Sequence, residues 1–232
     1  KDHRALFEGL EIASHPALCA AWMNRYPTVF ITLRQVEGLN FQDAYGQLLY
    51  EIALLYQEHA YVLNGASMSE PEKQLYRRLM NREADRTDVL RSIEFLTQVL
   101  HKHYGRKVIL LMDEYDVPVA KANTNGYYQE MLDVMKGLMR AVKDNASLQF
   151  AIITGCLKIA KESIFTGTNN FVSDSILHAR FGEYFGFLQE EVDRILRDAN
   201  VSDRADRVKS WYDGYHFGES DVYCPWDVMN YM

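Results

Sequence analysis

Three short, largely apolar runs constrain the fold more than any other feature of the sequence. They are TVFITL at residues 28–33, KVILLM at residues 107–112 and FAIITG at residues 150–155. Each is rich in β-branched residues, and none alternates regularly between apolar and polar positions. Such a run is typical of a strand in a parallel sheet that helices cover on both faces. The sequence therefore predicts an α/β fold built on central, parallel strands.

Between these runs, apolar residues recur at the spacings of three and four that are typical of amphipathic helices. One such stripe begins after Asn40, a good N-cap residue, and a second begins at Thr87 and stops at Gly105. A third stripe covers residues 128–142 and connects the second run to the third. The order strand, helix, strand over residues 107–155 predicts a right-handed βαβ unit.

The character of the sequence changes after the third run. Residues 161–175, KESIFTGTNNFVSDS, are rich in Ser, Thr, Asn and Gly and predict an extended loop. Helical spacing then resumes, interrupted by a predicted turn at Asp213-Gly214. We therefore expect an α/β core over residues 1–186 and a small helical subdomain, lid-like or winged-helix-like and incomplete, over residues 187–232.

Charge and cysteine content argue against several classes of protein. The 25 Lys and Arg residues against 32 Asp and Glu residues give a net charge of −7, which argues against a protein that coats nucleic acid. The apolar runs are much shorter than the roughly 20 residues that span a membrane. The three cysteines lie far apart and no histidine cluster has metal-ligand spacing, so structural zinc is not expected. These features predict a soluble, cytoplasmic protein without membrane contact.

The second apolar run leads directly into acidic residues, in KVILLMDEYD at residues 107–116. Ligands of open α/β sheets bind at the carboxyl ends of the strands, where Asp113 and Glu114 would lie. Asp113 is suited to hold Mg²⁺ through its water shell, and Glu114 to polarise the water that attacks a γ-phosphate. This is the Walker B arrangement. Acids after a strand also cap helices, and Asp116 is assigned mainly to that role.

A nucleotide site also needs a phosphate-binding loop, in which Gly-rich backbone is followed by Lys and then by Ser or Thr. None of the 13 glycines is followed by Lys. Either the nucleotide interpretation is wrong, or the strand, loop and helix that bind the phosphates precede Lys1 in the full protein. The abrupt start of the sequence inside an amphipathic segment favours the second explanation.

Several segments, taken in order, resemble the bacterial AAA-ATPase-like family. They are LLMDEYDVPV at 110–119, TGCLKIAKESIFTGTNNF at 154–171, YFGF at 184–187, WYDGYHFG at 211–218 and VYCPWDVMNY at 222–231. The likeness covers nearly the whole chain, from YPTVFITL onward. It implies a parallel-sheet P-loop NTPase core of the AAA or STAND type, which lacks its N-terminal phosphate-loop unit and is followed by a small C-terminal helical subdomain.

The resemblance also implies roles for residues at matching positions. Asp113 and Glu114 match the Walker B pair. Thr154 stands where the sensor 1 residue is expected, since its hydroxyl can hydrogen-bond the γ-phosphate or the attacking water. A Thr that closes a strand can also simply cap the following turn. All three residues would thus contact ATP, its Mg²⁺ or the attacking water.

Other polar residues are weaker candidates. Arg180 is kept as a sensor 2 or arginine-finger candidate, because a guanidinium offsets the charge that develops on a transferring phosphate. Arg194 and Arg197 are better explained by ordinary ion pairs or a solvent-facing helix. Lys158 and Lys161 follow the third apolar run and are better explained as surface lysines.

The resemblance therefore implies a switch module that binds and hydrolyses ATP with Mg²⁺, and these 232 residues alone are expected to be inactive. Relatives often carry a C-terminal PD-(D/E)XK nuclease-like domain, which would be an attached partner and could bind nucleic acid. A homo-oligomer is also compatible with the resemblance. Two alternatives stay open: a non-catalytic scaffold with a degenerate ATPase fold, and the regulatory part of a nuclease. The Glu-x-Lys triplet of PD-(D/E)XK nucleases is absent, so any nuclease would lie beyond Met232.

Overall fold

The computed structural model describes residues 4–156 and 171–231, and the chain divides into two compact units, residues 1–168 and residues 169–232. The second unit begins earlier than the expected boundary after residue 186. The reason is that the 3-10 helix η5 (Ala179–Tyr184) contacts the strands β4 (Asp213–Phe217) and β5 (Ser220–Tyr223), which belong to the second unit.

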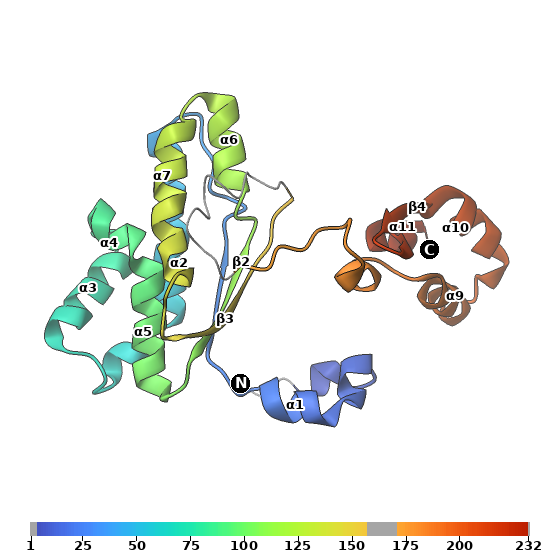
Figure 1. The fold of residues 1–232 in the computed structure, drawn as a ribbon, viewed down its shortest axis with the longest axis horizontal. Helices are drawn as coiled ribbons and strands as arrows, with labels where there is room; N and C mark the ends of the chain where they lie inside the picture. The colour runs from blue at the N-terminus through green and yellow to red at the C-terminus, as the bar shows by residue number, and fades with distance from the viewer. Residues whose placement is uncertain (1–3, 157–170, 232) are drawn as a thin grey trace. The chain divides into compact units, whose positions relative to one another are not determined.

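The first unit combines a parallel sheet with helices (Figure 1). Its strands are β1 (Thr28–Thr32), β2 (Val108–Asp113) and β3 (Leu148–Ile153). Its α-helices are α1 (Pro16–Trp22), α2 (Phe41–Glu58), α3 (Glu70–Met80), α4 (Arg86–Leu90), α5 (Ser92–Tyr104), α6 (Val117–Asn125) and α7 (Tyr128–Leu138). Short 3-10 helices are η1 (Arg4–Phe7), η2 (Glu11–Ser14), η3 (Ala60–Asn64) and η4 (Met139–Val142).

The sheet confirms the central part of the sequence interpretation. The three apolar runs form its three strands in the order β1-β2-β3, and both neighbouring pairs are parallel. The strand that carries the acidic residues, β2, is therefore the middle strand. Helices α6 and α7 connect β2 to β3, which confirms the predicted βαβ unit.

Helix boundaries follow local capping chemistry. The side chain of Asn40 accepts a hydrogen bond from the Asp43 N–H at 3.0 Å and so begins α2, as predicted. Gly105 ends α5 in the left-handed conformation, also as predicted. The stripe from Thr87 is instead divided between α4 and α5. Helix α4 begins one residue before Thr87, because the Asp85 side chain caps it.

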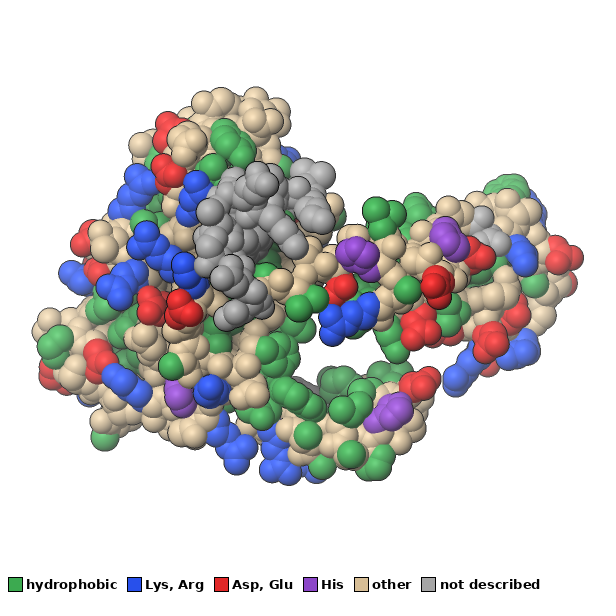
Figure 2. All heavy atoms as spheres, in the orientation of Figure 1, with side chains coloured by type: hydrophobic (Ala, Val, Ile, Leu, Met, Phe, Trp, Pro, Cys, Tyr) green, Lys and Arg blue, Asp and Glu red, His purple; other side chains and the backbone are tan. Residues whose placement is uncertain are grey.

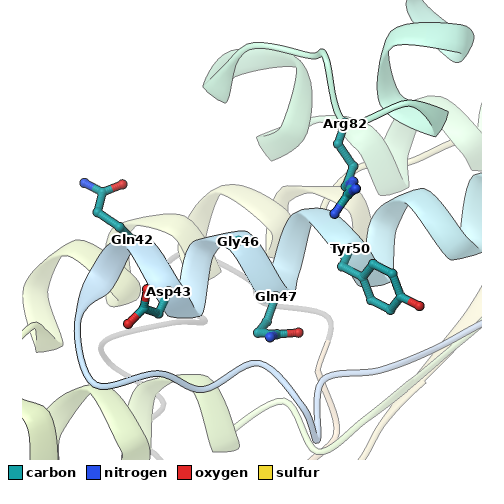
Figure 3. A pocket seen from close by; sticks show the side chains of 6 residues that line it. All are labelled: Gln42, Asp43, Gly46, Gln47, Tyr50 and Arg82. Atoms are coloured by element: carbon teal, nitrogen blue, oxygen red, sulfur yellow. The ribbon is translucent and has the colours of Figure 1, made fainter.

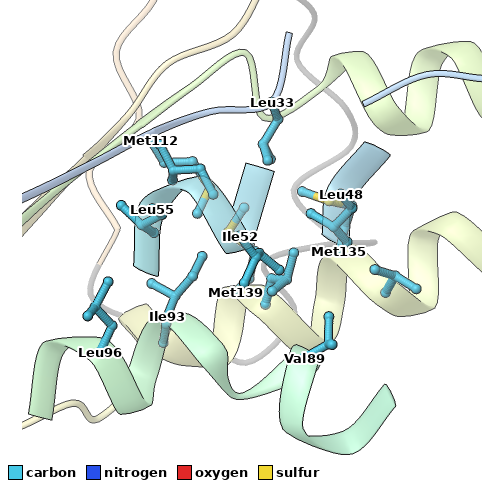
Figure 4. Packing of buried hydrophobic residues seen from close by; sticks show 14 of the residues in the cluster. Leu33, Leu48, Ile52, Leu55, Val89, Ile93, Leu96, Met112, Met135 and Met139 are labelled. Atoms are coloured by element: carbon cyan, nitrogen blue, oxygen red, sulfur yellow. The ribbon is translucent and has the colours of Figure 1, made fainter. Parts of the chain in front are cut away.

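One face of the sheet carries the hydrophobic core of the first unit. Its strands pack there against α2, α5 and α7, which lie on the same side of the sheet (Figures 1 and 4). The fully buried side chains of this layer include Val29, Leu48, Ile52, Ile93, Leu96, Leu110, Met112 and Met135. Burial of so many large aliphatic side chains is the main stabilising contribution to this unit.

The opposite face of the sheet is largely uncovered by the described residues. Phe30, Phe150 and Ile152 are 54%, 37% and 49% exposed on it. Trp22, at the end of α1, makes an edge-to-face contact with Phe150, with 5.4 Å between ring centroids. The expectation of helices on both faces is therefore wrong for the described part of the chain. Apolar residues at successive positions indicate that both faces carry apolar side chains, but they do not indicate whether a helix covers each face.

The second unit is mixed rather than purely helical. It contains η5, α9 (Gln189–Asp198), η6 (Ser202–Arg204), α10 (Ala205–Tyr212), the antiparallel pair β4 and β5, and α11 (Pro225–Tyr231). A small cluster of Val192, Leu196, Val208, Tyr223 and Val228 forms its core. None of the helices described in either unit has the length and hydropathy needed to cross a membrane.

The predicted turn at Asp213-Gly214 is wrong. Both residues belong to β4, and the chain reverses at Gly218, which has φ +60 and leads into β5. A Cβ at Gly218 would also overlap the backbone of Ala179. The tight turn thus falls at the glycine that needs both a left-handed conformation and close packing.

Candidate functional site

The carboxyl ends of the three parallel strands bring one carboxylate and two hydroxyl groups together. Asp113 ends the middle strand, its partner in register on β1 is Thr32, and Thr154 follows β3 directly. The Thr154 hydroxyl donates to Asp113 Oδ1 at 2.6 Å, and the Thr32 hydroxyl makes a longer contact with Oδ2 at 3.4 Å. We refer to Thr32, Asp113 and Thr154 as the Asp113 row.

The Asp113 row opens onto the uncovered face of the sheet. Successive side chains of a strand point to opposite faces, so Asp113 shares a face with Leu111, and Thr32 shares it with Phe30. Leu111 and Phe30 are themselves paired in register. The Asp113 side chain is half-buried rather than enclosed. The carboxylate therefore lies on the face that the described residues leave largely uncovered.

Glu114 holds an unusual backbone conformation next to the row. Its φ is +56, in the left-handed region, which costs a non-glycine residue about 1–2 kcal/mol. Two backbone hydrogen bonds hold this conformation: Tyr115 N–H donates to the Thr154 carbonyl at 3.1 Å, and Val117 N–H donates to the Glu114 carbonyl at 3.2 Å. Strained residues of this kind concentrate at functional sites. The chain thus leaves the extended conformation at Glu114, immediately after Asp113.

Beneath these residues, Asp116 has a buried side chain, only 2% exposed. It occupies the predicted N-cap position of α6, but its side chain makes no capping hydrogen bond. A Cβ at Gly155 would overlap both Asp116 Oδ1 and the ring of Tyr115. The absence of a side chain at Gly155 therefore allows the segment after β2 to pack against the segment after β3.

Comparison with known proteins shows the family to which the chain belongs. A family model described as "Predicted AAA-ATPase" matches residues 1–165, which contain the whole sheet and the Asp113 row. The chain belongs to the AAA-ATPase-like family. The match confirms the resemblance of the first unit and does not include a nuclease domain.

One curated relative of this AAA-ATPase-like chain is the "Uncharacterized protein in vnfD 5'region" of Azotobacter chroococcum mcd 1. The two are 30% identical over 136 residues, which are 58% of this chain and 26% of the relative. The chain thus matches about a quarter of the length of that relative. No solved structure matches the chain.

The acidic residues at the site of this AAA-ATPase-like chain affect the pKa of Cys156, an exposed thiol just after Gly155. The pKa of the Cys156 thiol is raised above its ordinary value, chiefly by the negative charge of Glu114. Partial burial and the carboxylates of Asp116 and Asp113 raise it further. The three acids therefore act together on one small region beside the row, where a bound cation would be stabilised.

This arrangement predicts the reactivity of Cys156. Glu114→Gln removes the largest cause of the raised pKa, so a larger fraction of the thiol is ionised at pH 8 and alkylation by iodoacetamide becomes faster. Peptide mass spectrometry measures the rate, with the half-buried Cys19 and Cys224 as internal references. Glu130→Gln, on the exposed side of α7, is the matched control. Equal rates in the two variants would contradict the placement of Glu114 beside Cys156.

The remaining sequence candidates are not part of the Asp113 row. Arg180 belongs to the second unit, where it forms an ion pair with Asp174 at 3.2 Å. Its guanidinium also lies over the ring of Phe181, 4.8 Å from the centroid. Its role as an arginine finger stays a prediction. Lys158 and Lys161 lie outside the described residues.

The Asp113 row offers one carboxylate that could hold a magnesium ion. Within residues 4–156 and 171–231, no group of three or more His, Cys, Asp or Glu side chains is arranged to hold a metal. Magnesium usually keeps several water ligands and is bound through one or two carboxylates together with substrate phosphates. A half-buried carboxylate that two threonine hydroxyls orient is chemically compatible with such a site.

Proposed function

We propose that this AAA-ATPase-like chain is part of a switch module that binds and hydrolyses ATP with Mg²⁺. The observation that carries the proposal is the Asp113 carboxylate, held between the hydroxyls of Thr32 and Thr154 at the carboxyl end of the middle strand. Membership of the family supports a nucleotide as the ligand. The position supports it too, because open α/β sheets bind ligands at this edge.

Each residue of the site has a proposed task. Asp113 would hold Mg²⁺ through water, and the bound ion would neutralise charge on the phosphates. Glu114 would accept a hydrogen bond from the attacking water and increase its nucleophilicity. The Thr154 hydroxyl, which now donates to Asp113, would donate instead to the γ-phosphate or to that water. Thr32 would keep Asp113 oriented from the other side.

These 232 residues contain no Gly-Lys pair, and we propose that the phosphate-binding segment belongs to the flanking chain. We propose that it packs on the uncovered face of the sheet. Phe30, Phe150 and Ile152 on that face supply apolar surface that another segment can bury. The same face carries Asp113, so a phosphate loop packed there would lie beside the proposed magnesium site. An attached C-terminal effector, nuclease-like in the resemblance, would respond to the nucleotide.

The proposal is tested by titrating the full-length protein with a fluorescent ATP analogue. The full-length protein here means these residues together with their natural flanking chain. We expect saturable binding that requires Mg²⁺. Binding without saturation, or none, would favour the non-catalytic scaffold instead. Cleavage of plasmid DNA by the 232 residues alone in Mg²⁺ would contradict the assignment and favour a nuclease.

A further inference from the structure

A polar hollow of about 670 Å³ lies on the outer side of α2 and shares no residue with the Asp113 row (Figure 3). Its volume is in the range of sites that bind small ligands or short peptide segments. The residues that line it are Gln42, Asp43, Gly46, Gln47, Tyr50 and Arg82. Five of them belong to α2, and Arg82 follows α3.

Nothing in the described part of the chain requires glycine at position 46. Gly46 lies inside α2, where glycine weakens a helix, and a Cβ there would meet no described atom within 4 Å. Gly137 in α7 shows the contrast, because a Cβ there would lie 2.6 Å from Cδ2 of Leu90. What Gly46 provides instead is bare helix backbone at the floor of the hollow, which another chain can approach closely.

Arg82 shows the reverse case, because a large side chain occupies a backbone position that favours glycine. It has φ +63 at the end of α3, where the Glu83 N–H donates to the Arg78 carbonyl at 2.8 Å in a Schellman motif. Glycine is the usual residue at this left-handed position, and α5 and α6 end on Gly105 and Gly126, with φ +64 and +82. The fold alone would therefore favour glycine rather than arginine at position 82.

Both exceptions line the same hollow, and residues that oppose the local preference of the backbone concentrate at functional sites. The Arg82 guanidinium lies 5.8 Å from the centroid of the Tyr50 ring, and no carboxylate of the described residues forms an ion pair with it. The carboxylate of Asp43 lies at the other end of the hollow, beyond Gln47 (Figure 3). The hollow thus offers a cation at one end and, at the other, an anion whose Oδ2 accepts a hydrogen bond from Asn40 Nδ2 at 2.7 Å.

We propose that the hollow binds an extended peptide segment of a partner protein, with an acidic side chain opposite Arg82 and a basic side chain opposite Asp43. A guanidinium binds a carboxylate through two parallel hydrogen bonds. The seven residue steps from Asp43 to Tyr50 span about 10 Å of helix, which corresponds to about three residues of extended chain. The exposed amides of Gln42 and Gln47 can pair with peptide groups, and Gly46 leaves room for the backbone.

The test uses the whole 232-residue chain labelled with ¹⁵N and the probe acetyl-Glu-Ala-Ala-Lys-amide, followed by NMR. We expect saturable shifts of the amide signals of Gly46 and Gln47 and of the Arg82 Nε–H signal. The peptides Glu-Ala-Ala-Glu and Lys-Ala-Ala-Lys should bind at least about fivefold more weakly, since each places one charge against a like charge. Absence of saturable shifts, or equal affinity for the three peptides, would overturn the proposal.

Two variants distinguish binding from folding. Arg82→Gly and Gly46→Gln each introduce the residue type that the local backbone favours, so both should raise the melting temperature. Both should also lower the affinity for the probe peptide at least about fivefold. Arg77→Gln, at an exposed position of α3 outside the hollow, should leave binding unchanged. Unchanged binding in both hollow variants would refute the peptide site. Shifts of the same signals by a single-stranded oligonucleotide, but not by the probe, would refute the choice of ligand.

Discussion

Replacing Glu114 by Gln is expected to lower the rate of ATP hydrolysis by the full-length protein at least about 100-fold while ATP remains bound. A positioned general base contributes roughly 10²- to 10⁴-fold to such reactions, and an amide cannot polarise water as a carboxylate does. Gln has nearly the same shape as Glu, so the left-handed conformation at position 114 is equally strained in both proteins. The change therefore removes the charge and keeps the backbone.

Phosphate release and binding of a fluorescent ATP analogue, measured on the same preparations, separate chemistry from binding. Glu130→Gln, at an exposed position of α7 outside the Asp113 row, removes one negative charge, and this variant should hydrolyse ATP at the normal rate. If Glu114→Gln hydrolyses ATP as fast as this control, Glu114 has no role in activating water.

The second large effect is expected in the core. Leu110 is fully buried in the middle of β2, and Leu110→Ala should lower the free energy of unfolding of the first unit by about 2–5 kcal/mol. The loss combines the transfer free energy of the missing side chain with the cost of the cavity that remains. Hydrogen exchange of the β2 amides measures this free energy for the first unit alone.

Ile152→Ala is the matched control on the neighbouring strand. Ile152 is 49% exposed on the uncovered face, so its truncation in the 232-residue chain should cost about 1 kcal/mol or less. The same change in the full-length protein should cost more, because the proposed phosphate-binding segment would bury this position. Equal losses for Leu110→Ala and Ile152→Ala in the 232-residue chain would contradict the one-sided burial of the sheet.

The sheet was predictable because parallel strands that helices cover must carry apolar side chains, which then appear as apolar runs in the sequence. The sequence correctly predicted the three strands and the βαβ connection. It did not predict the uncovered face, because Phe30 and Phe150 contribute the same apolar signal whether or not a helix covers them. The sequence also did not predict the β4–β5 hairpin. These two strands are short and rich in aromatic residues, and the apolar residues on either side have helical spacing.

At the site, Asp113 was predicted from its place after the second apolar run and Thr154 from the family resemblance. The structure brings the two side chains into hydrogen-bond contact. Thr32 was missed because its place beside Asp113 depends on the register between β1 and β2, which no local pattern contains. A hydroxyl near the end of a neighbouring apolar run was the available signal. The packing of Asp116 against Gly155 and the left-handed Glu114 are tertiary features that depend on contact between two chain segments.

The central claim is that Asp113 binds the magnesium ion of a nucleotide. The most direct measurement is the affinity of the full-length protein for the fluorescent ATP analogue with and without Mg²⁺, in Asp113→Asn and in Asp133→Asn, an exposed aspartate of α7. We predict that Mg²⁺ tightens binding at least about tenfold in the wild-type and Asp133→Asn proteins and has no such effect in Asp113→Asn. An equal dependence on Mg²⁺ in all three proteins would contradict the account.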